Sequence, residues 1–208
     1  MSSQPITGAV LAGGRSRRLG QDKPSLLLGG RPLALWVAEA LAPWVTECWL
    51  VTNQPQSHLS LGLPLVTDLR PWQGPLGGLE TALFYARTPL VLAAAADVPF
   101  LEPSLLAALA SRAAQGVKTA VICHTSRGPQ PFPGIYAVRL LSRLTAFLHE
   151  GGRQVQRFLD QCRPLALPPE EVARLDPQGR SFMNLNTPED FQAAARLVIE
   201  NPRVSPSS

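Results

Sequence analysis

Aromatic residues are scarce in this 208-residue chain, where phenylalanine, tryptophan and tyrosine together make up 6% of the sequence. Proteins that bind RNA or single-stranded DNA stack bases on exposed aromatic side chains, so this scarcity argues against a nucleic-acid-binding module. Long apolar runs are also missing. The longest uninterrupted one, LVLAAAA at residues 90–96, is far too short to cross a bilayer, so we expect no membrane insertion.

Cysteines are few as well, since the chain has only Cys48, Cys123 and Cys162, and no Cys-x-x-Cys pair. No secretory leader precedes them, because the first residues lack the basic stretch that opens a signal peptide. We therefore expect reduced, buried thiols in a cytoplasmic protein. The Gly-x-Ser-x-Gly and His-Glu-x-x-His motifs of hydrolases are absent, and the three histidines show no metal-binding spacing.

Short apolar runs alternate with segments of helical periodicity along most of the chain. We expect strands at residues 7–11, 48–52, 63–67, 90–95, 119–123 and 133–138, and helices at 33–44, 77–86, 103–115, 140–148 and 188–199. This alternation predicts an α/β fold with a mostly parallel sheet, whereas proline-rich residues 163–181 show no clear pattern. Length and a 45% hydrophobic content predict one domain over residues 1–200, followed by a disordered tail at 201–208.

The first apolar run leads into a loop that gathers much of the positive charge, VLAGGRSRRLGQDKPSLLL at residues 10–28. The formal net charge is only +4, so Arg15, Arg17 and Arg18 indicate a local site. Arginine forks match phosphate oxygens and Lys23 adds a mobile point charge, so this loop could hold a triphosphate. Neither a P-loop nor a Gly-x-Gly-x-x-Gly pattern is present. The alternative to a phosphate-binding site is a solvated basic loop or a weak nucleic-acid-binding patch.

A lone carboxylate, Asp97, follows the apolar run in LAAAADVPFL. It should lie at the carboxyl end of a central strand, where open α/β sheets bind ligands. Mg²⁺ is held by one or two carboxylates together with substrate phosphates and waters, so Asp97 is a candidate metal ligand. Taken alone, the Asp-x-Pro sequence also fits a turn or a helix N-cap, and the basic loop in the same chain is what favours the metal.

Two further stretches carry weaker signals. In TDLRPWQGPLGGLETAL, Asp68 ends another expected strand, and the glycines after it either allow close approach of a base or ribose or form an ordinary turn. In FMNLNTPEDF, Asn184 and Asn186 are expected at a late strand end. The Thr-Pro-Glu-Asp that follows is typical of a helix N-cap with an acidic first turn.

Taken in order, these motifs resemble the molybdenum cofactor guanylyltransferases and their nucleotidyltransferase relatives. The resemblance covers about residues 6–195 and rests on LAGGRSRRLGQDKPSLLLGGRPL, DLRPWQGPLGGLETAL, ADVPFL, PFPGIYAV and FMNLNTPEDF. It implies a Rossmann-like three-layer α/β/α fold and transfer of GMP from GTP to the phosphate of molybdopterin, with Mg²⁺ as cofactor and pyrophosphate as product. The implied partners are GTP and molybdopterin, with cofactor-delivery chaperones or molybdoenzyme apoproteins as candidates.

The resemblance also implies site residues. Nucleotide-binding positions fall at Leu11, Ala12, Gly13, Gly14, Lys23, Asn53, Asp68 and Asp97, with Thr52 as the alternative to Asn53. Catalytic roles fall to Lys23, Arg18 and Asp97, and Asp97 is the expected metal ligand. We further expect Arg153, Asn184 and Asn186 to bind the acceptor, although Arg153 is equally well explained as a cation at a helix C-terminus.

Other functions fit parts of the sequence. A related transferase could use CTP, or could load a sugar phosphate. Guanine presents two adjacent donors, N1–H and the N2 amino group, to which a carboxylate such as Asp68 is suited, whereas cytosine presents one amino donor beside acceptors. A non-catalytic cofactor-binding adaptor is the alternative outside the enzymes, and it would be expected to have lost Lys23 or Asp97, both of which are present.

Overall fold

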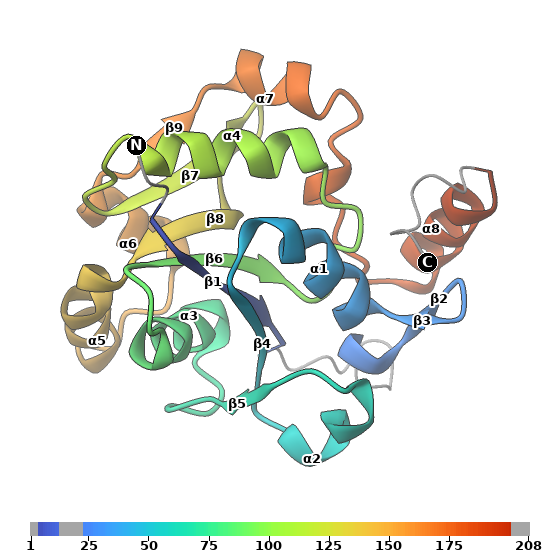
Figure 1. The fold of residues 1–208 in the computed structure, drawn as a ribbon, viewed down its shortest axis with the longest axis horizontal. Helices are drawn as coiled ribbons and strands as arrows, with labels where there is room; N and C mark the ends of the chain where they lie inside the picture. The colour runs from blue at the N-terminus through green and yellow to red at the C-terminus, as the bar shows by residue number, and fades with distance from the viewer. Residues whose placement is uncertain (1–3, 13–22, 201–208) are drawn as a thin grey trace.

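The computed structural model describes residues 4–12 and 23–200. Gly13, Gly14 and Arg18 of the basic loop lie outside the described residues, as does the expected tail at 201–208. The described chain forms a seven-stranded sheet in the order β5-β4-β1-β6-β8-β7-β9 and a separate two-stranded ribbon of β2 and β3 (Figure 1).

Six of the seven strands in the large sheet run in the same direction. β1 pairs in parallel with β4 and β6, β4 with β5, and β7 with β9, whereas β8 is antiparallel to both β6 and β7. The expected mostly parallel sheet is therefore confirmed. The strands are β1 (Ile6–Leu11), β4 (Glu47–Thr52), β5 (Leu65–Thr67), β6 (Leu90–Ala95), β7 (Ala120–Thr125), β8 (Gly128–Ala137) and β9 (Leu165–Leu167).

Helices cover both faces of the sheet and complete the three layers (Figure 1). One face carries α1 (Leu33–Leu41), α4 (Pro103–Ala114) and α7 (Pro169–Leu175), and the other carries α3 (Gly74–Tyr85), α5 (Leu141–His149) and α6 (Val155–Cys162). α8 (Pro188–Glu200) packs beside the ribbon of β2 (Leu27–Leu28) and β3 (Arg31–Pro32), and the short α2 (Pro55–His58) precedes β5. Single 3₁₀ turns lie at Lys23–Ser25, Ala42–Trp44, Leu59–Leu61, Val138–Leu140 and Arg180–Phe182.

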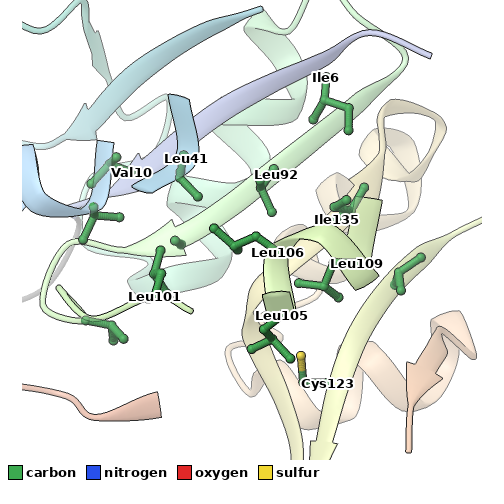
Figure 2. Packing of buried hydrophobic residues seen from close by; sticks show 14 of the residues in the cluster. Ile6, Val10, Leu41, Leu92, Leu101, Leu105, Leu106, Leu109, Cys123 and Ile135 are labelled. Carbon is green, nitrogen blue, oxygen red and sulfur yellow. The ribbon is translucent and has the colours of Figure 1, made fainter. Parts of the chain in front are cut away.

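The strands are continuous apolar runs in the sequence because helices bury both faces of the sheet. In β1, Val10 belongs to the apolar cluster under α1 and α4, whereas Ala9 and Leu11 belong to the cluster under α3 and α5. Figure 2 shows the first of these clusters, in which Leu105 and Leu109 of α4 lie over the sheet. Each such fully buried leucine contributes roughly 1.5–3 kcal/mol of hydrophobic stabilisation.

The strand order creates a switch point between β1 and β6. The chain moves from β1 outward to β4 and β5, then returns through α3 to place β6 on the other side of β1. Leu11 is paired with Ala95, so the two central strands end together. We call the side of the sheet where these parallel strands end the carboxyl edge, and ligands of open α/β sheets bind at this edge beside a switch point.

The last third of the chain differs from the expectation in three places. Asn184 and Asn186 do not end a strand, because residues 183–187 follow a 3₁₀ turn and form no ladder. The backbone bond that joins this segment to the residues after β6 runs from the Leu185 N–H to the Asp97 carbonyl. Residues 163–181 are not patternless either, since they contain β9 and α7. The helix α6 was not expected from the sequence, because its eight residues bury only three side chains, those of Phe158, Leu159 and Cys162.

None of the helices described combines the length and apolarity that crossing a bilayer demands.

Candidate active site

The centre of the carboxyl edge is built by the backbone that leaves β1 and β6. The Leu11 carbonyl accepts a hydrogen bond from the Ala96 N–H at 3.0 Å, and the Ala12 N–H donates to the Val51 carbonyl at 2.8 Å. Leu11 is buried and Ala12 half-buried, so the described chain enters the basic loop at the switch point. Lys23 begins a 3₁₀ turn on the far side of this loop, and its side chain lies outside the described part of the structure.

Asp97 lies two residues beyond the end of β6, and its side chain is half-buried. Its carbonyl accepts the Leu185 N–H at 2.9 Å, and this bond brings the segment with Asn184 and Asn186 beside it. Asn184 is exposed and Asn186 half-buried. The expected strand end is therefore wrong, but the backbone bond to Asp97 brings the irregular segment with the two asparagines beside the residues that follow β6.

The segment is held at its far end by the N-terminus of α8. The Thr187 N–H donates to Asp190 Oδ2 at 2.9 Å, and the Asp190 N–H donates to Thr187 Oγ1 at 3.2 Å. This reciprocal pair is a capping box, and it confirms the helix start predicted from Thr-Pro-Glu-Asp. Asp190 Oδ2 also accepts the Asn186 N–H at 2.9 Å, so it fixes the backbone that carries Asn186.

Asp68 follows β5 and is 7% exposed, which makes it one of the few buried carboxylates in the described chain. Burial raises the pKa of its carboxyl from 3.8 to about 6, although hydrogen bonds from Thr81 and Asn53 oppose that rise. Its backbone N–H donates to the Thr52 carbonyl at 3.2 Å, which continues the pairing of β5 with β4. The carboxyl group of Asp68 is therefore held at the carboxyl edge with a pKa of about 6, not far below neutral pH.

Asn53 lies beside Asp68 and hydrogen-bonds to its carboxyl group. Asn53 Oδ1 is buried and has no hydrogen-bond partner among the residues described. The hydroxyl of Thr52, by contrast, accepts the Gln54 N–H at 3.0 Å, and Thr52 is 1% exposed. Of the two alternatives left by the sequence, Asn53 is the one with an acceptor atom that a ligand donor would satisfy.

The glycines after Asp68 serve packing and turn geometry. A Cβ on Gly77 would lie 2.7 Å from the Gln73 Cβ, and Gly74 has a φ of +68°. Gly78 differs from them, because its Cβ position lies 3.5 Å from Leu11 Cδ2 and 3.8 Å from Asp68 Oδ1. Turn geometry therefore accounts for Gly74 and close packing against Gln73 accounts for Gly77, whereas Gly78 lets α3 approach the residues at the edge.

Residues 8–165 match the family model of the MobA-like NTP transferase domain, over the sheet and edge just described. The chain belongs to this family of nucleotidyltransferases. A probable molybdenum cofactor guanylyltransferase of Chloroflexus aggregans is 36% identical over 191 residues, which cover 90% of this chain and 92% of that protein. A molybdenum cofactor guanylyltransferase of Cereibacter sphaeroides is 36% identical over 199 residues, with 93% and 97% covered.

The fold agrees with that of a solved relative. The crystal structure of molybdopterin-guanine dinucleotide biosynthesis protein A from Archaeoglobus fulgidus superposes with a TM-score of 0.80 at 27% identity, covering 94% of this chain and 100% of that one. The Rossmann-like three-layer architecture expected from the sequence is thereby confirmed.

MobA-like nucleotidyltransferases generally use a divalent metal ion, and the edge offers a suitable but sparse set of ligands. Within residues 4–12 and 23–200, no three side chains of histidine, cysteine, aspartate or glutamate come together as a metal-binding group. A hard divalent cation that takes most of its oxygens from phosphates and water needs only one or two carboxylates. Asp97, half-buried beside the switch point, fits that requirement.

Arg153, expected at the acceptor site, lies just beyond α5. Its Nη1 donates to the carbonyl oxygens of Leu148 at 3.0 Å and Gly152 at 2.8 Å. These contacts are those of a cation at a helix C-terminus, which was the alternative explanation. A role in binding the acceptor stays a prediction.

Two polar residues of α3 were missed from the sequence. Glu80 and Thr81 are 2% and 0% exposed, and both contact the loop that follows Asp68. The available signal was their position in GPLGGLETALFY, where an adjacent Glu-Thr interrupts an otherwise apolar helix. Buried polar side chains need partners, so such a pair predicts a contact with another segment.

Proposed function

We propose that this protein transfers GMP from GTP to the phosphate of molybdopterin and releases pyrophosphate. The observation that carries the proposal is the arrangement of Asn53, Asp68 and Asp97 along one edge of the sheet, beside the loop that leaves β1. Relatives named as molybdenum cofactor guanylyltransferases, matched over nine-tenths of the chain, support the choice of substrates. The chain's own part in the cell would then be cytoplasmic cofactor synthesis.

In the proposed reaction, an oxygen of the molybdopterin phosphate attacks the α-phosphorus of GTP in line with the departing pyrophosphate. The new P–O bond forms as the bond to the β-phosphate oxygen breaks, so no covalent enzyme intermediate is needed. Asp97 would hold Mg²⁺, which when bound neutralises charge on the phosphates. Lys23 and Arg18 would add positive charge that favours the leaving pyrophosphate.

The nucleoside would lie along the ends of β1, β4 and β5. We assign the backbone of residues 11–14 to the nucleotide, because an N–H donor near a glycine pair can approach phosphate or ribose closely. Asp68 and the unpartnered Asn53 Oδ1 are neighbouring acceptors. Guanine's adjacent N1–H and N2 donors complement two such acceptors, whereas the Watson–Crick edge of cytosine does not, and this favours GTP over CTP.

The acceptor would approach from the side of β6 and the segment that follows Asp97. Asn184 and Asn186 offer amide groups there, since Leu185 between them is bound to the Asp97 backbone. Arg153 would contribute a cation to the molybdopterin phosphate.

The test is a transfer assay with the purified full chain, molybdopterin, MgCl₂ and either GTP or CTP. We expect pyrophosphate release and a guanine dinucleotide product with GTP, and little of either with CTP. Product formed mainly from CTP would assign the cytidylyltransferase alternative. Molybdopterin binding without pyrophosphate release from any nucleoside triphosphate would assign the adaptor.

A further inference from the structure

Thr81 is fully buried in the middle of α3, on the side that faces the end of β5. Most of its neighbours along the helix, such as Leu79, Ala82 and Leu83, fill the apolar cluster between α3 and the sheet. A threonine is less favourable than alanine in a helix interior, and a buried hydroxyl must also be satisfied. Apolar packing alone therefore does not explain why a hydroxyl group occupies this position in α3.

Its hydroxyl group joins the helix to two consecutive residues of the loop. Thr81 Oγ1 accepts a hydrogen bond from the Leu69 N–H at 3.0 Å. The Thr81 hydroxyl also donates to Asp68 Oδ1 at 3.3 Å. The same proton has a second acceptor, the Gly77 carbonyl at 2.9 Å. Because charged acceptors form the stronger hydrogen bonds, ionisation of Asp68 draws this proton toward its carboxylate.

These contacts hold the backbone of Asp68 on both sides. Its own N–H is bound by the Thr52 carbonyl at 3.2 Å, and the next N–H, that of Leu69, is bound by Thr81. Neighbouring Glu80 fixes the following residue, because Arg70 Nε donates to Glu80 Oε2 at 2.9 Å and to Oε1 at 3.2 Å. Two adjacent residues of α3 thus fix three consecutive residues of the loop.

We propose that Thr81 is a positioning residue, which orients the Asp68 carboxylate toward the nucleotide without touching the nucleotide itself. The proposal takes GTP as the ligand from the proposed function. The hydrogen bond between Thr81 and Asp68 belongs to the chain alone, and its effect on the Asp68 carboxyl group can be measured without any ligand.

The test compares Thr81→Val, which keeps the side-chain shape and removes the hydroxyl, with Thr81→Ser, which keeps the hydroxyl. Thr7 offers a matched control at the opposite edge of the sheet. It is also fully buried, its hydroxyl lies 3.3 Å from Glu47 Oε1, and a second contact, to Thr88 Oγ1, is 2.9 Å long. Thr7→Val therefore removes a hydroxyl–carboxylate contact of the same length far from the carboxyl edge.

Calorimetry with GTP and Mg²⁺ should show a Kd about tenfold higher for Thr81→Val than for wild type, the loss expected for one hydrogen bond to a charged group. Thr81→Ser should bind within about twofold of wild type, and so should Thr7→Val, even though both valine variants melt at lower temperature. Equal Kd values for Thr81→Val and Thr7→Val would show that Thr81 is merely structural and would overturn the proposal. So would a Thr81→Ser variant that binds as weakly as Thr81→Val.

A ligand-free measurement separates this proposal from the proposed function. The Asp68 carboxyl, followed by carbon NMR, should titrate at higher pH in Thr81→Val than in wild type, since the Thr81 hydrogen bond lowers its pKa. Thr7→Val and Thr81→Ser should leave that titration unchanged, and a titration that Thr81→Val does not move would overturn the proposal. Failure of the wild type to bind GTP would contradict the proposed function and leave this result to decide the role of Thr81.

Discussion

Removing the negative charge of Asp68 should stabilise the folded protein at neutral and alkaline pH. Burial raises the pKa of this carboxyl from 3.8 to about 6, so the folded chain binds the proton more tightly than the unfolded chain. The proton on Asp68 therefore adds to the free energy of unfolding. This contribution is fully present below about pH 3.8 and is lost as the pH rises through 6. At about pH 8 the buried carboxylate therefore opposes folding.

The magnitude follows from the size of the rise. One pKa unit corresponds to about 1.4 kcal/mol, so a rise from 3.8 to about 6 corresponds to about 3 kcal/mol. The hydrogen bonds from Thr81 and Asn53 can be retained by the amide oxygen of an asparagine. We expect Asp68→Asn to raise the free energy of unfolding by about 1–3 kcal/mol at about pH 8, and by much less at about pH 4.

Urea unfolding followed by circular dichroism, at several pH values between about 4 and 8 and without nucleotide, measures this difference. A gain of the same size at every pH would mean that Asp68 titrates alike in the folded and unfolded chains, and no gain at about pH 8 would mean that the buried carboxylate does not oppose folding. Either result would refute the reasoning. The same variant should lose preference for GTP over CTP by about 1–3 kcal/mol in the ratio of kcat/KM values if Asp68 reads the base. An Asp68→Asn variant that is more stable but less selective for GTP would indicate that the carboxylate serves nucleotide binding at a cost to the stability of the fold.

Four other substitutions test the remaining roles. Asp97→Asn should keep the fold but lose nearly all transfer activity and weaken Mg²⁺ binding, and wild-type turnover would remove Asp97 from the metal site. Lys23→Ala should lower kcat about a hundredfold, and a rise in KM alone would make Lys23 a binding residue. Gly152→Ala should lower stability by about 1–3 kcal/mol in thermal unfolding, because its Cβ would lie 2.4 Å from a ring carbon of Phe147, and an unchanged melting temperature would mean that the ring moves aside. Arg153→Ala should weaken molybdopterin binding about tenfold in titrations, and unchanged affinity would leave Arg153 only its contacts at the end of α5.

The sheet and the approximate places of the site residues were predictable because they depend on local patterns. An apolar run buried on both faces is visible in the sequence, and so is the polar residue at which it ends, as with Asp97 after β6 and Asp68 after β5. The capping box of α8 was predictable for the same reason, since both of its partners lie within four residues.

What the sequence did not reveal depends on contacts between distant segments. Thr81 binds a residue 12 positions away, and Thr145 of α5 donates to Glu80 across 65 positions at 2.7 Å. Whether Asn53 or Thr52 points toward a ligand depends on where each side chain finds a partner, which periodicity does not encode. The irregular backbone around Leu185 is likewise fixed by Asp97, which lies far away along the chain.

The reversal of β8 has an electrostatic consequence for the carboxyl edge. A helix that follows a parallel strand starts near that edge, as α3 does at Gly74, and presents its free N–H groups and the positive end of its dipole there. α5 follows β8 and runs the other way: its preceding turn begins at Val138, which is bound to the Pro89 carbonyl, and it ends at His149, which contacts Arg70.

α5 therefore turns its C-terminal carbonyls and the negative end of its dipole toward the side of the edge where Arg70 lies. Arg153 neutralises part of that end through Leu148 and Gly152. Because of one antiparallel strand, the carboxyl edge has two halves of different electrostatic character. Near α3, the N–H groups at the start of the helix attract an anion. Near α5, an anion has to be bound by the side chains of cationic residues. Phosphate binding at the α5 half should accordingly be the more sensitive of the two to salt and to the loss of a single arginine.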